Sequence, residues 1–499
     1  MFCSLYSRKV VETMTEKKQD ISRWYYLDIN KALNPDIDRI DAVVGIPEDR
    51  TLKANFDRDI VLDVSTRDKE FANHLFPLNI SYDISGTMQW ITGYNLFHKE
   101  DANAAERIAA FADRVLSVIQ SYDVPVITLS KKVPKEAVCQ VFENVNTGGV
   151  ALTVFELVTA SFAADDYDLR KDWERREKEF KDTKLLGEVT ATDFLSSLTL
   201  LVGYEKFKAG GPALSCTKKD ILNITLAEYT AKADAISTGY RDAEKFLKEQ
   251  RIFTSRDLPY NTQLIPLAAM YAHLGNRQYD STVKVKIEKW FWCGVLGEMY
   301  GGANETRYAL DMAGVIEWID NDASMPDTVT RAYFNATRLL SLQTRLSAAY
   351  KGLMALILKA GCKDFITGSA MDFTTFLDEN TDIHHIFPRE HCETNKLLRE
   401  KWNSIVNKTP LFYRTNRMIG GSAPSKYLKK IEANVAKDSL NGNLASHLVE
   451  VSAIRADDFD GYFVARAKSI VALIENAMGK PVSGKDTDET ISAFGASLV

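Results

Sequence analysis

The chain has 499 residues, of which 45% are hydrophobic and 26% are charged, the composition of an ordinary soluble globular protein. At roughly 150 residues per domain, this length predicts about three domains. A net charge of −6 argues against indiscriminate nucleic-acid binding, and no stretch reaches the ~18 apolar residues of a membrane span. The six cysteines show no CxxC spacing, which argues against a zinc ribbon and favours a reducing compartment. We therefore expect a cytoplasmic protein that does not enter a membrane.

The first 150 residues predict an α/β domain. Residues 24–29 and 59–64 are rich in aromatic and β-branched side chains and predict strands. Between residues 101 and 122, apolar side chains recur at the spacing of one helical face. The last elements expected in this domain are a strand at 124–129 and a helix at 134–145.

A paired-glycine turn, Asn146-Thr147-Gly148-Gly149, comes next. It leads into Thr153-Val154-Phe155-Glu156, a capping-box pattern that predicts the start of a helix. A glycine-rich turn before a helix N-terminus can bind an anion such as a nucleotide phosphate. The same pattern is typical of a simple tight connection, and spacing alone leaves both interpretations open.

The remainder of the chain is mostly helical in pattern, so the expected fold class is α+β and predominantly helical. A helical domain is expected at 151–345, with helices near 217–250, 262–274 and 283–300. Its aromatic cluster Trp290-Phe291-Trp292 lies within one helix, which favours core packing over a base-stacking platform. A further domain is expected at 346–479, with a helix at 351–360 and a helical stretch at 435–478. The polar, small residues at 480–499 predict a flexible tail.

The segment Asp382-Ile383-His384-His385-Ile386-Phe387-Pro388 contains two of the seven histidines. Adjacent imidazoles on a short strand can send one ring to a metal and leave the other to accept a proton. Asn407 and Asn416 follow around a strand-like segment, and Pro424 then opens a helical pattern at a first-turn position. Neutral histidine is a suitable base for activating water in phosphodiester hydrolysis, and a divalent cation can neutralise phosphate charge.

This segment is also locally basic. Residues 382–430 contain ten Lys or Arg and four Asp or Glu, a local charge of +6 that leaves −12 for the rest. A basic region within an acidic protein suits a site that meets phosphates, although chance imbalance on a solvated face gives the same count. The cations expected to bind a DNA backbone are Lys408, Arg414, Arg417 and Lys426.

The motif resembles the active site of HNH nucleases, including the HNH domain of RNA-guided CRISPR nucleases. Those domains have an acid-His-apolar-apolar-Pro motif and two asparagines nine residues apart, as Asn407 and Asn416 are here. The resemblance implies a ββα-metal fold with His385 as general base and Asn407 shaping the catalytic loop. It implies a metal held by His384 and Asn416. Because histidine replaces the usual acid at 384, Mn²⁺ is expected to serve as readily as Mg²⁺.

A wider resemblance covers about residues 5 to 475. DIHHIFP, the later NKT, TNR and APSKYL segments, and residues 141–157 resemble GmrSD-type modification-dependent restriction endonucleases. That family combines a ParB/sulfiredoxin-like N-terminal domain, associated with nucleoside triphosphate binding and hydrolysis, with a C-terminal nuclease. The resemblance implies restriction of base-modified phage DNA.

The DGQQR motif typical of the family's N-terminal domain is absent from this sequence. We therefore expect a truncated sensor domain at 1–150, to which an upstream segment or a partner chain supplies the missing part. A homodimer would allow cleavage of both DNA strands. The alternative interpretation is a nucleotide- or DNA-sensing binding protein whose nuclease is inactive without that missing part.

Overall fold

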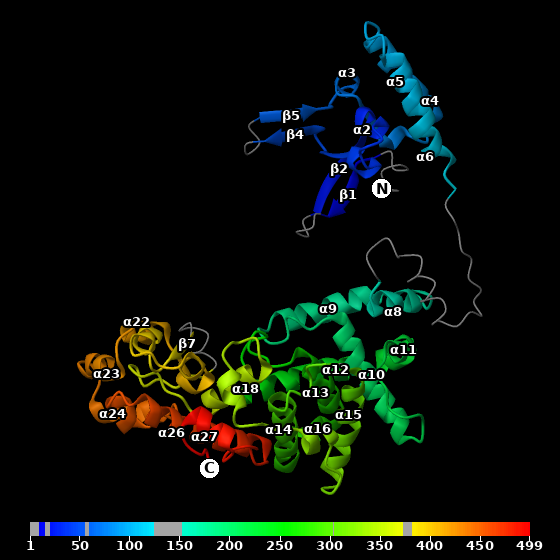
Figure 1. Cartoon of the computed structure of the whole chain (residues 1–499). Helices are drawn as coiled ribbons and strands as arrows, with labels where there is room; N and C mark the ends of the chain where they lie inside the picture. Colours follow the sequence, from blue (N-terminus) through cyan, green and yellow to red (C-terminus); the bar gives the residue numbers. More distant parts are fainter. Residues whose placement is uncertain (1–8, 15–19, 55–58, 124–151, 303, 373–381) are drawn as a thin grey trace. The chain divides into compact units, whose positions relative to one another are not determined.

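The computed structural model describes residues 9–14, 20–54, 59–123, 152–302, 304–372 and 382–499. These residues are predominantly helical with a few small antiparallel sheets, which confirms the α+β class (Figure 1). Over these ranges, no helix combines the length and apolar character needed to cross a membrane. The chain divides into two compact units, residues 1–129 and residues 130–499.

The N-terminal unit contains an antiparallel sheet. Its central strand β2 (Asp20–Asp28) pairs with β1 (Val11–Met14), β3 (Val43–Pro47) and β6 (Leu75–Pro77). Because side chains alternate along a strand, Tyr26 and Leu27 enter separate apolar clusters on opposite faces. A second ribbon pairs β4 (Thr51–Ala54) with β5 (Asp59–Asp63). The strands expected near 24–29 and 59–64 are confirmed.

Helices cover the Leu27 face of this sheet, where Trp90 and Phe111 are buried. The helix expected at 101–122 is present, but it is divided into α5, a π-helical turn at Ala112–Leu116, and α6. The helical elements of this unit are α2 (Ile29–Leu33), η1 (Arg39–Ala42), α3 (Arg67–Ala72), η2 (Leu78–Ile80), α4 (Ile84–Phe97), α5 (Ala104–Phe111) and α6 (Ser117–Ser121).

The described part of the larger unit begins with helices, as predicted. The Thr153 hydroxyl accepts from the Glu156 N–H, and the Glu156 carboxylate accepts from the Thr153 N–H at 2.6 Å, so the capping box is confirmed. The helix expected at 217–250 is two helices, α11 and α12. The helices of residues 152–360 are α8 (Val154–Ala163), α9 (Leu169–Lys181), α10 (Ala191–Lys208), α11 (Lys218–Leu222), α12 (Leu226–Glu249), α13 (Leu264–Leu274), α14 (Ser281–Leu296), α15 (Glu305–Asp320), α16 (Asp327–Arg331), α17 (Arg338–Ser341) and α18 (Ala348–Lys359).

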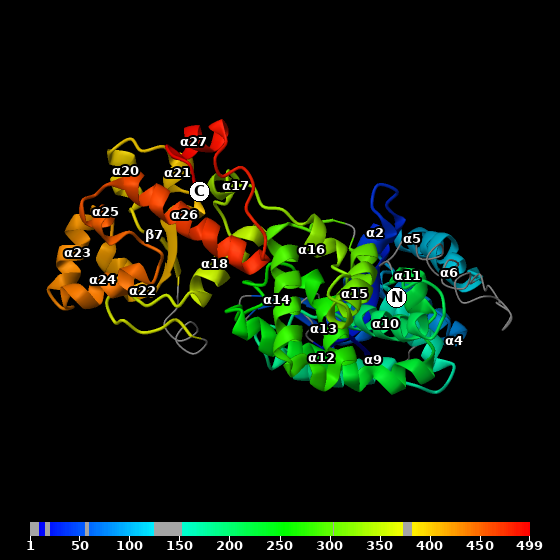
Figure 2. The same ribbon diagram turned by 90° about the horizontal axis from the view of Figure 1, so that it is seen from below.

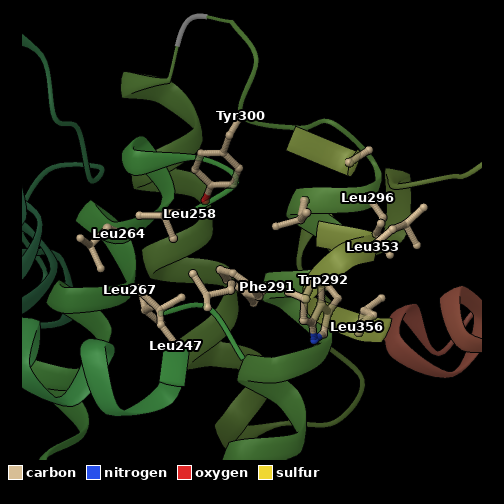
Figure 3. Packing of buried hydrophobic residues seen from close by; sticks show 14 of the residues in the cluster. Leu247, Leu258, Leu264, Leu267, Phe291, Trp292, Leu296, Tyr300, Leu353 and Leu356 are labelled. Carbon is tan, nitrogen blue, oxygen red and sulfur yellow. The ribbon is translucent and has the colours of Figure 1, made fainter. Parts of the chain in front are cut away.

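The aromatic cluster on α14 packs in the core. Trp290, Phe291 and Trp292 are at most 1% exposed. Figure 3 shows Phe291 and Trp292 among leucines that come from α12, α13 and α18. Because these rings are closed off from solvent, they cannot stack on nucleic-acid bases, and the packing interpretation is confirmed.

The histidine motif lies in the last part of this unit, next to α18 (Figure 2). The long helix α26 packs against both α14 and α18, so the domains expected at 151–345 and 346–479 share one apolar core. The elements are β7 (Asp382–His385), α20 (Arg389–Thr394), α21 (Arg399–Trp402), η6 (Ile405–Asn407), β8 (Lys408–Leu411), α22 (Tyr413–Ile419), α23 (Pro424–Glu432), α24 (Lys437–Ala445), α25 (Val451–Arg455), α26 (Phe459–Met478) and α27 (Asp488–Phe494).

The flexible tail expected at 480–499 is instead packed on the fold. Ser483 forms a β-bridge with Asn335, and α27 follows. Val482, Phe494 and Leu498 are at most 4% exposed. The polar composition of this segment obscured three widely spaced apolar side chains that dock it.

We predict that Phe494→Ala destabilises the larger unit by about 3 kcal/mol, the usual cost of removing a buried phenylalanine ring. The Phe494 ring stacks on Phe463 of α26 with centroids 5.6 Å apart. Urea unfolding measures the change. Ile491→Ala is the control, because Ile491 lies on the same helix but is 41% exposed. Equal, small effects of both substitutions would mean that the segment does not pack.

Candidate active site

The two neighbouring histidines lie on a short antiparallel hairpin that is followed by a helix. β7 pairs with β8 so that His384 lies opposite Thr409 and His385 opposite Lys408. Two short helices, α20 and α21, and the turn η6 lie between the paired strands in the chain, and α22 begins directly after β8. Successive side chains of a strand point to opposite faces. His384 and His385, the last two residues of β7, therefore have different neighbours, and the two rings can take different tasks.

Asn407 holds the turn that follows β7. Its Nδ2 donates to the carbonyl oxygens of Phe387 and Trp402, and its Oδ1 accepts from the Phe387 N–H, each at 2.9 Å. Asn407 is fully buried, where an unpaired amide would cost about 1–3 kcal/mol. The two bonds to Phe387 fix the backbone just after His385. They are the kind of loop-shaping contact that the sequence predicts for Asn407.

His385 is half-buried beside Trp402, Asn403 and Lys408. Its Nε2 lies 3.3 Å from Oδ1 of Asn403, and the Trp402 ring meets it edge-on with centroids 5.6 Å apart. Burial, and then the nearby charge of Lys408, lower the pKa of His385 to about 4. The ring is therefore neutral at pH 7 and keeps a lone pair that can take a proton.

Three buried side chains from later helices hold the backbone near His385 and Asn407. Tyr427 of α23 donates to the carbonyl oxygen of Ile386 at 3.0 Å. On α26, the Tyr462 hydroxyl and the Arg466 guanidinium donate to the carbonyl oxygen of Val406 at 3.1 and 2.5 Å. The shape of this region therefore depends on helices far from the histidine motif in sequence.

The carboxylate of Asp364 anchors the start of α22. Asp364 is fully buried and accepts from the Phe412 N–H at 3.2 Å and from the Thr415 hydroxyl at 2.8 Å. The first N–H groups of a helix have no partner within the helix. A carboxylate at this end therefore fixes the position of the helix that carries Asn416.

The prediction that Lys408 contacts DNA is wrong. Its Nζ donates to the carbonyl oxygen of Gln343 at 2.6 Å and lies over the Tyr350 ring. Lys408 is only 8% exposed, and burial lowers the pKa of its ammonium to about 8. An ammonium enclosed in this way cannot reach a phosphate on the surface. The sequence shows the charge of this residue but not the strand face on which it lies.

The other three predicted DNA contacts, Arg414 and Arg417 on α22 and Lys426 on α23, are exposed. Within the described part of the chain, no ion pair joins them to a carboxylate. Lys429 and Lys430 of α23 are exposed as well. Neighbouring exposed cations on two consecutive helices are the arrangement that a phosphate backbone requires.

His384 and Asn416, the predicted metal ligands, are both half-buried, His384 on β7 and Asn416 on α22. No hydrogen bond joins them within the described residues. Nor do any three His, Cys, Asp or Glu side chains of these ranges form a group that could hold a metal ion. An imidazole nitrogen and an amide oxygen therefore do not suit a closed zinc site. They suit a cation that takes its other ligands from water and phosphate.

The possible nucleotide-binding turn Asn146-Thr147-Gly148-Gly149 lies outside the described residues. The strand expected at 124–129 and the helix expected at 134–145 do too.

Several residues around His385 were missed by the sequence analysis. Gln343, Asp364 and Arg466 come from segments with no motif, and only the fold brings them to the hairpin. Asn403 lies four residues before Asn407, so its closeness in sequence to that motif residue was the signal that could have found it.

Comparison with known proteins adds a distant relative. No protein-family model matches the chain. An uncharacterized protein of Methanocaldococcus jannaschii is 26% identical over 430 residues, a match that spans 82% of this chain and 67% of that protein. Since 82% of the chain is more than residues 130–499, the match includes parts of both compact units. The name of this relative assigns no activity.

His447 contacts Thr409 of β8 and is fully buried. Its Nε2 is 2.7 Å from the carbonyl oxygen of Lys363, and its Nδ1 is 2.6 Å from the Thr409 hydroxyl. Because a carbonyl oxygen only accepts, Nε2 carries the proton and Nδ1 accepts from Thr409. Burial lowers the pKa of His447 to about 3, and the charge of Arg466 also lowers it.

We predict that His447 makes stability fall as the pH drops below about 6.5, the ordinary pKa at which the unfolded chain takes up this proton. Its contribution is complete above that pH and decreases below it, by about 1 kcal/mol between pH 7 and pH 5.5. Urea unfolding at both pH values measures the effect. His447→Gln keeps a donor and an acceptor but does not titrate, so its stability should change by about 1 kcal/mol less. An equal pH dependence in both proteins would contradict this role.

Proposed function

We propose that this chain is a metal-dependent DNA endonuclease of the HNH type. The observation that carries the proposal is the fixed loop after β7: Asn407 binds both backbone groups of Phe387, next to the neutral ring of His385. The pairing of β7 with β8, the helix α22 that follows β8, and the exposed cations of α22 and α23 support it. A buried loop anchor, a base and a basic surface are what phosphodiester hydrolysis needs from the protein.

In the proposed reaction, a water molecule beside a bound phosphodiester gives a proton to the free ring nitrogen of His385. The hydroxide attacks phosphorus, the bond from phosphorus to the leaving sugar oxygen breaks, and that oxygen takes a proton from water. His384 and Asn416 would hold Mg²⁺ or Mn²⁺, which when bound supplies positive charge against the phosphate oxygens. Asn407 keeps the backbone of Phe387, two residues after His385, in place throughout.

The resemblance to GmrSD-type restriction endonucleases supports base-modified phage DNA as the substrate and the cytoplasm as the place of action. The resemblance rests on the histidine segment and on residues 141–157. A second copy of the chain would supply the active site for the opposite strand. A partner that completes the N-terminal domain, and a nucleoside triphosphate bound there, belong to the same proposal.

We predict that His385→Ala lowers Mn²⁺- or Mg²⁺-dependent cleavage of duplex DNA by at least about 100-fold, because general-base catalysis contributes about that much or more. DNA affinity and the unfolding midpoint should change little, since the ring is half-buried and its hydrogen bond to Asn403 is long, at 3.3 Å. A plasmid-nicking assay measures the loss. His391→Ala is the matched control, because His391 is also half-buried and lies six residues further along on α20.

If His385→Ala cleaved DNA as fast as the wild-type protein, His385 would not be the general base. If the wild-type protein bound DNA but did not cleave it with Mg²⁺ or with Mn²⁺, the result would instead favour a DNA-sensing protein that depends on a partner for activity.

We further predict that replacing Arg414, Arg417 and Lys426 by alanine weakens DNA binding and reduces the slope of log K against log salt by about 2 to 3, because each phosphate contact contributes about 0.9. Fluorescence anisotropy at several salt concentrations measures the slope. The control replaces three exposed cations of α9, namely Arg170, Lys171 and Lys178. If both triple variants changed the slope equally, the cations of α22 and α23 would not form the DNA-binding surface.

A further inference from the structure

A chain of polar side chains leads from His385 to a turn in the helical part of the larger unit. His385 Nε2 lies 3.3 Å from Asn403 Oδ1, and Asn403 Nδ2 donates to Gln343 Oε1 at 3.2 Å. Gln343 Nε2 in turn donates to the carbonyl oxygen of Leu340 at 3.2 Å. His385, Asn403 and Gln343 are all half-buried, so water competes only partly for these bonds.

The donor and the acceptor of each hydrogen bond in this chain can be assigned by starting from the carbonyl oxygen of Leu340. The Leu340 carbonyl can only accept, so the amide nitrogen of Gln343 faces it and Oε1 faces Asn403. Asn403 must then donate to Gln343, which turns its own oxygen towards His385. Since that oxygen only accepts, the neutral ring of His385 carries its proton on Nε2. Nδ1 is left with the lone pair.

The turn that carries Gln343 is held to the hairpin by two further hydrogen bonds. The Ile405 N–H donates to the carbonyl oxygen of Leu342 at 2.8 Å. Lys408, opposite His385, donates to the carbonyl oxygen of Gln343 at 2.6 Å. This explains why a lysine is buried at that place: it ties the turn to the strand next to His385.

We propose that Gln343 and Asn403 are positioning residues that hold His385 in its Nε2–H tautomer with Nδ1 facing the attacking water. The tautomer stands on the hydrogen bonds alone, and its use in cleavage rests on the proposed nuclease function. Gln343 lies outside the histidine motif, just after α17, so the orientation of the base depends on the helical part of the unit. Partners of this kind, one bond removed from a reacting group, typically change activity by about 10- to 100-fold.

Nitrogen chemical shifts of the imidazole rings test the tautomer directly, on full-length protein labelled with [¹⁵N]histidine, without DNA or metal. We expect the His385 ring, assigned by its absence in His385→Gln, to show a protonated Nε2 and a bare Nδ1 at pH 7.5. Asn403→Ala should convert these signals to those of mixed tautomers. Asn403→Asp should preserve them, because a carboxylate still accepts from Nε2–H. Gln343→Ala, which leaves Asn403 in place, should give an intermediate spectrum.

Asn395→Ala is the matched control. Asn395 Nδ2 pairs with His391 Nδ1 at 3.3 Å on α20, so this substitution should change only the His391 signals. In the nicking assay, Asn403→Ala should lower kcat by about 10- to 100-fold with an unchanged KM, and Asn403→Asp should restore part of it.

A wild-type His385 ring protonated on Nδ1, or an Nε2–H tautomer that survives in both Asn403→Ala and Gln343→Ala, would overturn the proposal. These results are separate from the nuclease assignment, because the spectra need no cleavage. If His385→Ala still cleaved DNA while the tautomer was as expected, the proposed function would fail. The assignment of Gln343 and Asn403 as the residues that fix the tautomer would still hold.

Discussion

Three hydrogen bonds from one carboxamide determine the shape of the region around His385. Asn407 pairs with both backbone groups of Phe387 and with the carbonyl oxygen of Trp402, so it joins the end of β7 to the residues before β8. The hairpin has only four residues in each strand, and such a short ribbon is weak by itself. It has a single geometry because buried side chains from α23 and α26 hold its backbone from outside.

The polar groups of this region are arranged around two histidines with opposite roles. His447 is fully enclosed, is satisfied on both ring nitrogens and contributes to stability. His385 is half-buried and pairs with Asn403 through one ring nitrogen, and the proposed function uses the other as the base. Burial keeps both rings neutral at pH 7. What separates a structural histidine from a candidate base here is the number of ring nitrogens with a protein partner.

Sequence patterns predicted the helical content, the capping box before α8 and the strands near 24–29 and 59–64, because these depend on local spacing. They failed where long-range packing decides. Lys408 has the charge of a DNA contact, but it lies on the strand face that turns inward to Gln343. Phe494 is a lone aromatic in a polar segment, yet it docks the C-terminus on α26. Gln343 and Asp364 have no motif, since their proximity to the hairpin exists only in the folded chain.

The central claim is that His384, His385 and Asn416 meet one phosphate in front of the loop held by Asn407. The most direct measurement is a crystal structure of His385→Ala with duplex DNA and Mn²⁺, with the metal located by its anomalous scattering. The account predicts one Mn²⁺ peak bound by His384 and Asn416 and by an oxygen of a phosphate beside position 385. DNA bound elsewhere, or Mn²⁺ held without either of these two side chains, would contradict it.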